Sequence, residues 1–137
     1  MILAAALLED IIDHARADYD AECCGMIAYE PGSGDAQPQA VRVHRARNIF
    51  ASRKRFEIDG KELLRTLGEF EDDGLELGAI YHSHTHTDPY PSQTDVNFAA
   101  GWPGLEWVIV GLGADQPEVR CYLIEGPEIR DVPLQVI

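Results

Sequence analysis

The chain is poor in basic residues, and this shortage restricts its partners. It has 11 Lys and Arg against 24 Asp and Glu, which gives a formal net charge of −13 over 137 residues. Nucleic acids and anionic membranes are bound through positively charged surface. We therefore expect neither a nucleic-acid partner nor a membrane partner for this chain.

Cysteine and long apolar runs are also scarce. The three cysteines, of which Cys23 and Cys24 are adjacent, do not make a disulfide framework. No apolar run approaches the roughly 20 residues that a membrane-spanning helix needs. The apolar residues 1–8 lack a basic region and lead directly into Glu9 and Asp10, unlike a signal peptide. These absences predict a cytoplasmic protein.

The remaining composition is typical of a compact enzyme. Hydrophobic residues make up 45% of the chain, which excludes general disorder. The sequence has no repeat, linker or low-complexity tract, and its length suffices for a real core. We therefore expect one domain over residues 1–137. The oligomeric state is left open, with a homodimer as one alternative.

Hydrophobic periodicity and turn residues predict a mixture of helices and strands. Helices are expected at residues 4–19, after Asp59 as far as Gly74, and just after Ser92. Strands are expected at residues 24–29, 41–45, 56–58, 77–81, 105–112, 119–124 and 129–136, with a turn at 31–35. The predicted fold class is α/β (α+β), a curved mixed sheet with helices packed on its faces.

Two histidines follow the strand expected at residues 77–81. His82 and His84 are separated by one residue, and side chains two positions apart on a strand point to the same side. On a helix the same spacing would turn the two rings in nearly opposite directions. The pattern therefore predicts two imidazoles aimed at one point from the end of a strand.

A carboxylate can complete this pair. Ser92 is a good N-cap, and Asp95 follows in the capping-box position, where the helix dipole favours an ionised carboxylate. With His82 and His84, Asp95 makes a ligand set that leaves one position of a zinc ion open, as in catalytic zinc sites. The alternative is that Ser92 and Asp95 only cap a helix while the histidines lie in a loop.

The residues from His82 to Asp95 resemble the motif of the JAMM (MPN-plus) metallopeptidases: His-Ser-His, seven residues, Ser, two residues, Asp. That family has a glutamate far upstream, and Glu22 stands at the matching place. Residues 80–85 and 90–96 are similar to the small bacterial Mec-type branch, which releases cysteine from the C-terminus of a ubiquitin-like sulfur-carrier protein. The resemblance covers nearly the whole chain and implies a cytidine-deaminase-like JAMM/MPN fold.

The resemblance also implies a role for each motif residue. One zinc ion per chain would be held by His82, His84 and Asp95, and it would lower the pKa of a bound water. Glu22 would be the general base that takes the proton of that water. From its local sequence alone, Glu22 would instead be an ordinary solvated residue at a helix end. Ser92 would donate to the oxyanion of the tetrahedral intermediate, a role that competes with helix capping.

The substrate is indicated by departures from the wider family. Thr85 follows the second histidine, where many eukaryotic deubiquitinating relatives have Pro, and their longer insertions are missing. Both differences favour a small adduct, the bond between the Gly-Gly tail of a sulfur carrier and cysteine. The alternatives are a general deconjugating isopeptidase of ubiquitin-like modifiers and a metallohydrolase of unrelated small amides. A metal-free scaffold is disfavoured because all the motif residues are present.

Several other polar residues have less specific interpretations. His86 as a further ligand would close the open position of the metal, so we interpret it as a solvated or substrate-facing loop residue. Cys23 and Cys24 are expected to pack in the core. The basic segment 42–55 could dock an acidic or extended carrier tail. For Asn48, Ser52, Arg53 and Phe56, the resemblance implies a substrate-contacting segment, and an ordinary exposed loop is an equally open alternative.

Overall fold

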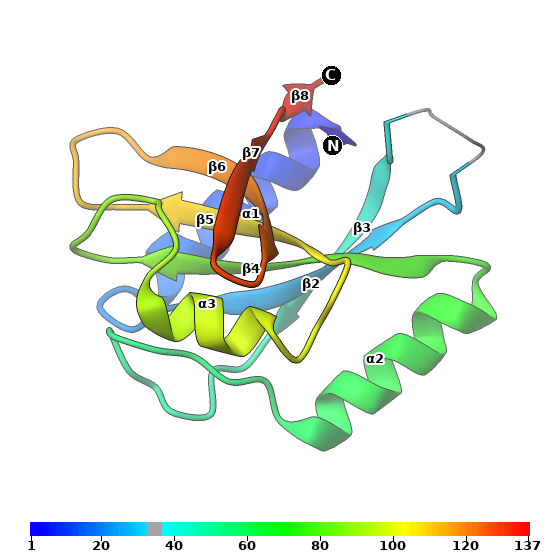
Figure 1. The fold of residues 1–137 in the computed structure, drawn as a ribbon, viewed down its shortest axis with the longest axis horizontal. Helices are drawn as coiled ribbons and strands as arrows, with labels where there is room; N and C mark the ends of the chain where they lie inside the picture. Colours follow the sequence, from blue (N-terminus) through cyan, green and yellow to red (C-terminus); the bar gives the residue numbers. More distant parts are fainter. Residues whose placement is uncertain (33–36) are drawn as a thin grey trace.

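The computed structural model describes residues 1–32 and 37–137, and a mixed six-stranded sheet runs through its centre (Figure 1). Its strands lie in the order β3-β2-β4-β5-β6-β7. Their bounds are β2 Cys24–Tyr29, β3 Ala40–Ala46, β4 Glu76–His84, β5 Glu106–Gly111, β6 Glu118–Glu125 and β7 Glu128–Val132. β4 and β5 run parallel, and the other neighbouring pairs run antiparallel. The predicted mixed sheet is confirmed, whereas the turn expected at 31–35 lies mostly outside the described residues.

Helices cover both faces of this sheet (Figure 1). α1 (Ala5–Asp18) packs on one face, and α2 (Gly60–Asp72) and α3 (Gln93–Ala99) pack on the other. On β4, Tyr81 belongs to the apolar cluster under α1, and Ile80 belongs to the cluster under α2 and α3. Alternate side chains of this central strand are therefore buried on opposite faces, which explains its continuous apolar run. No described helix has both the length and the apolar character to cross a membrane.

Two predicted strands differ from the structure. The strand expected at 129–136 is divided at Pro133, which has no N–H to donate to a ladder. After β7, the chain changes partner, and β8 (Gln135–Val136) pairs parallel with β1 (Ile2–Leu3), beside both termini. At 56–58 the structure has a single bridge between Asn48 and Ile58 instead of a strand.

Candidate metal centre

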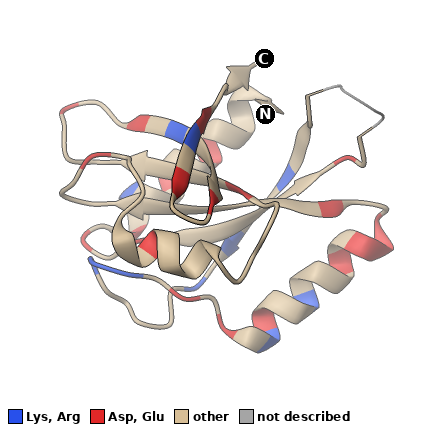
Figure 2. Cartoon of the chain, viewed as in Figure 1, with Lys and Arg blue, Asp and Glu red and all other residues tan. Residues whose placement is uncertain are grey.

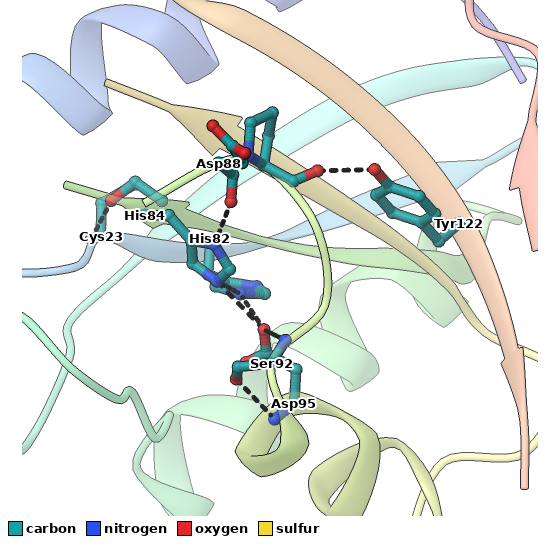
Figure 3. Close-up of polar contacts among 9 residues, drawn as sticks. Cys23, His82, His84, Asp88, Ser92, Asp95 and Tyr122 are labelled. Atoms are coloured by element: carbon teal, nitrogen blue, oxygen red, sulfur yellow. Dashed lines mark hydrogen bonds and ion pairs between the residues drawn. The ribbon is translucent and has the colours of Figure 1, made fainter. Parts of the chain in front are cut away.

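The residues predicted as ligands converge where β4 ends and α3 begins (Figure 3). The Nε2 atoms of His82 and His84 lie 3.2 Å apart. The Oδ2 atom of Asp95 lies 3.1 Å from the first and 3.0 Å from the second. All three residues are buried, and each offers one atom to a common point. The structure thus brings the predicted set together and favours it over a loop with a separate helix cap.

These separations fit a zinc ion. Zinc bonds of roughly 2.0–2.2 Å at tetrahedral angles place neighbouring ligand atoms about 3.3 Å apart. Two imidazoles and one carboxylate are also the donor types of catalytic zinc sites that keep a position open. Beside them, Oε1 of Glu22 is buried without a hydrogen-bond partner among the described residues. A buried acceptor left without a donor suits a site that binds a further polar group.

The pairing of β2 with β4 places Glu22 beside these ligands. Cys24 lies opposite His82 in the antiparallel register, so the chain two residues earlier runs past His84. Ser83 fixes this approach from the other face of β4. Its Oγ accepts the N–H of Cys23 at 2.8 Å, and its own N–H donates to the carbonyl of Cys23 at 3.2 Å. Sequence reasoning gave Ser83 no role, although its place between the two histidines put it on the opposite face.

Glu22 is buried, with 4% of its surface exposed, so the alternative of a solvated residue at a helix end is wrong. Burial raises the pKa of its carboxyl to about 8, an effect that Asp95 reinforces and His84 opposes. Its backbone is held on both sides. The N–H donates to the carbonyl of Ser52 at 2.7 Å, and the carbonyl accepts from Nδ2 of Asn48 at 3.0 Å.

Asn48 is therefore neither an exposed loop residue nor free to contact a substrate. Its side chain is buried and donates to the carbonyls of Glu22 and Arg55. Its Oδ1 accepts the backbone N–H groups of Phe50 and Glu57. The bond to Glu22 ties the loop after β3 to the segment that carries the candidate base, and the other three hold the loop itself together. Asn48 thus positions the candidate base through the backbone.

Ser92 caps α3 as predicted, and the cap involves the candidate ligand Asp95. Its Oγ accepts the N–H of Asp95 at 3.1 Å, and its N–H donates to Oδ2 of Asp95 at 3.0 Å. Burial alone would raise the pKa of Asp95, but the two histidines, led by His82, hold it well below its usual range. A hydroxyl that accepts one bond keeps its own hydrogen to donate. Capping and oxyanion binding by Ser92 therefore do not exclude each other, contrary to the expected competition.

Phe56 is not part of a strand in the structure, and it packs against the candidate ligand His82. Its ring stacks on that of His82 with centroids 4.6 Å apart and an interplanar angle of 24°. It also packs against the ring of Phe98 on α3, with centroids 5.3 Å apart. The aromatic pair closes the apolar side of the centre, which fixes the orientation of His82 by packing.

His84 is oriented by a hydrogen bond to the loop that follows it. Its Nδ1 donates to the carbonyl of Asp88 at 2.8 Å, which leaves Nε2 free to bind a metal ion. The next residue, Pro89, accepts from the hydroxyl of Tyr122 at 2.6 Å (Figure 3). Pro89 also packs on Gly111. A Cβ atom added at Gly111 would lie only 2.7 Å from Cδ of Pro89. We call the loop residues Asp88 and Pro89, held by Tyr122, the strap. No local sequence signal marks it, because it uses backbone carbonyls and a tyrosine 33 positions away.

Removing the Tyr122 hydroxyl that holds the strap should weaken metal binding. We expect Tyr122→Phe to bind zinc about 10-fold more weakly, because partners outside the ligand shell typically contribute 10–100-fold to affinity. The measurement is a competition titration against a chromophoric chelator. The matched control is Tyr29→Phe, which removes another largely buried tyrosine's bond, 2.8 Å long, to Glu106. The Tyr29→Phe control should lower stability without changing zinc affinity. Equal zinc affinity in Tyr122→Phe and the native chain would refute the strap's role.

His86 and the two adjacent cysteines take no part in the ligand cluster. His86 is about half exposed and pairs with Asp20 at 2.7 Å, as expected of a solvated loop residue. Cys23 and Cys24 are fully buried, which confirms their predicted packing. Burial raises the pKa of the Cys23 thiol to about 12. Such a thiol is a poor nucleophile, since the reactive form is the thiolate.

Known proteins share this fold and sequence pattern. Residues 4–125 match the family described as prokaryotic homologs of the JAB domain. The chain is 30% identical over 138 residues to the CysO-cysteine peptidase of Mycobacterium tuberculosis, covering 100% of this chain and 91% of that protein. It is 37% identical over 141 residues to the desampylase of Haloferax volcanii, covering 98% of this chain and 94% of that protein. A solved protein from Desulfitobacterium hafniense superposes with a TM-score of 0.88 at 26% identity, covering 100% of this chain and 93% of that one.

Proposed function

This chain belongs to the family of prokaryotic homologs of the JAB domain, and from that membership we propose a zinc peptidase that releases cysteine from the C-terminal glycine of a ubiquitin-like sulfur carrier. The family and its peptidase-named relatives make the chain a hydrolase. The observation that carries the proposal is the convergence of His82, His84 and Asp95 beside the buried Glu22.

The residues of the centre fit amide hydrolysis. A zinc ion held by His82, His84 and Asp95 supplies a Lewis acid and lowers the pKa of water. Glu22 takes the proton of the attacking water through its carboxylate and passes it to the nitrogen of the leaving amine. The carbon–nitrogen bond then breaks, which leaves a carboxylate on the carrier and a free amino group on the product. The raised pKa of Glu22 suits both proton transfers near neutral pH.

Ser92 is the residue proposed to stabilise charge on the substrate. Its hydroxyl keeps a hydrogen free while it caps α3, and it lies at the start of the helix that carries Asp95. Donation to the carbonyl oxygen strengthens as negative charge develops there during attack. One donor of this kind typically lowers the barrier by about 3 kcal/mol.

Deconjugation of ubiquitin-like modifiers is the broader activity that both curated relatives support. The Mycobacterium relative is named for cleavage of a cysteine adduct, which supports the narrower reaction. The Haloferax relative, at 37% identity, supports a general deconjugating isopeptidase as the second candidate. Unrelated small amides have no support from either relative.

A mass measurement separates the two candidates. We expect a ubiquitin-like carrier that ends in Gly-Gly-Cys to lose the mass of its cysteine residue, because the scissile carbonyl belongs to the last glycine. A chelator should abolish the reaction. An intact carrier beside efficient cleavage of a lysine-linked isopeptide would instead identify a general deconjugating peptidase.

The basic segment 42–55 has fewer charges available to dock the carrier than its sequence indicates. Arg42 pairs with Asp73, and Arg45 pairs with Asp10. Arg55 lies over the ring of Phe50, 4.0 Å from its centroid. Acidic partners partly neutralise Arg42 and Arg45, and the Arg55 guanidinium is already in contact with an aromatic ring. Attraction of an anionic substrate is therefore left to the remaining basic residues of the segment.

A further inference from the structure

A cavity of about 400 Å³ lies between the loops that follow β3 and β4, and Arg53, Lys54, His86 and Thr87 line it. His86 comes two residues after His84. Arg53 follows Ser52, whose carbonyl accepts the N–H of Glu22 at 2.7 Å. Both walls of the cavity are therefore continuous with segments that carry the candidate metal centre.

The cavity is cationic in a chain whose net charge is −13. Figure 2 shows the basic tip of the loop after β3, amid acidic residues elsewhere on the chain. Asp20 pairs with two of the lining residues and lies 2.7 Å from Nε2 of His86 and 3.7 Å from Nη1 of Arg53. The lining thus has two permanent cations, Arg53 and Lys54, against the one carboxylate that pairs with Arg53, so a positive charge remains. Asp20 also holds Arg53 and His86 near each other.

We infer that this cavity binds the α-carboxylate of the released amino acid, so that the enzyme selects a leaving group with a free carboxylate. This inference rests on the proposed function. In a carrier–cysteine adduct, the carboxylate is attached to the carbon next to the scissile nitrogen, so it lies beside the metal centre during cleavage. A guanidinium binds carboxylates through two parallel hydrogen bonds, and Arg53 can do so with Lys54 as a second charge.

The same contact discriminates against other adducts. An isopeptide-linked lysine has no carboxylate next to the scissile nitrogen, so Arg53 and Lys54 would gain nothing from it. Selection then follows from a difference in binding between two leaving groups. Both side chains are exposed, which limits the strength of each ion pair, so we expect a preference of about tenfold.

The test compares two carriers that differ in one group. One ends in Gly-Gly-Cys with a free carboxylate, and the other ends in the corresponding cysteine amide. The zinc-loaded native enzyme should favour the free acid about tenfold in kcat/KM, chiefly through KM. In the double variant Arg53→Gln, Lys54→Gln this ratio should fall to about one. Because both rates come from one preparation, incomplete folding or zinc loading cancels in the ratio.

The matched control removes two positive charges elsewhere. Arg120→Gln with Arg130→Gln changes the net charge equally, at arginines paired with Glu118 and Glu125 on the far strands of the sheet. This control should keep the preference for the free acid. Equal cleavage of both carriers by the native enzyme, or a preference that the Arg53 and Lys54 changes leave intact, overturns the inference while the proposed function stands. Cleavage of neither carrier overturns both.

Discussion

Replacing Glu22 by Gln should lower hydrolysis by about 10²–10⁴-fold while zinc stays bound. The amide has nearly the same shape as the carboxylate and fits the same buried place, but it cannot accept a proton from water. The ligands themselves are unchanged. Steady-state kinetics and elemental analysis of one preparation give both quantities. Near-normal turnover by this variant would show that Glu22 is not the general base.

Glu62→Gln is the matched control for this change. Glu62 is also a largely buried carboxylate, but it lies on α2, where it contacts Nε2 of His44 at 2.9 Å. Its replacement removes a comparable charge away from the candidate metal centre. We therefore expect the turnover of Glu62→Gln to stay close to that of the native enzyme.

The pH dependence of the reaction should report the same carboxylate. Glu22 acts as a base only when ionised, so activity should fall as the pH drops through its pKa. Burial raises this pKa to about 8, and a cation at the adjacent centre favours the ionised form and lowers it. The acidic limb of the pH profile in the zinc-loaded enzyme should therefore lie below pH 8. The residual activity of Glu22→Gln should lack this limb.

Local sequence predicts how the candidate ligands are arranged because the information is itself local. Alternation along a strand places His82 and His84 on one face, and a capping box places Asp95 in the first turn of a helix. Both rules depend on neighbouring residues alone. Glu22 could be assigned only through the resemblance, because its burial depends on strands that pair from distant parts of the chain.

Contacts between distant segments account for what sequence reasoning missed. Asn48 and Tyr122 act by binding backbone carbonyls, to which any residue type could contribute. Phe56 has strand-like neighbours, yet its segment forms only a single bridge in the structure, and its ring stacks on His82. Tertiary packing overrides β-propensity in this way. Pro133, by contrast, was a readable signal that the last predicted strand would be divided.

Loss of one metal ligand should have the largest effect of all. His84→Ala is expected to lose zinc and with it all measurable hydrolysis, because two protein ligands remain where the site needs three. Elemental analysis should find about one zinc ion per native chain and almost none in the variant. His86→Ala is the matched control, since it removes an exposed imidazole two residues away and should keep the zinc content of the native chain.

Zinc should also stabilise the native chain, because a metal that binds only the folded state raises its free energy of unfolding. Addition of a chelator should therefore lower the Tm of the native chain and of His86→Ala, and leave that of His84→Ala unchanged. This readout does not depend on the identity of the substrate. Native protein purified without chelators that contains no transition metal, and takes up none when zinc is added, would refute the metal centre and the mechanism built on it.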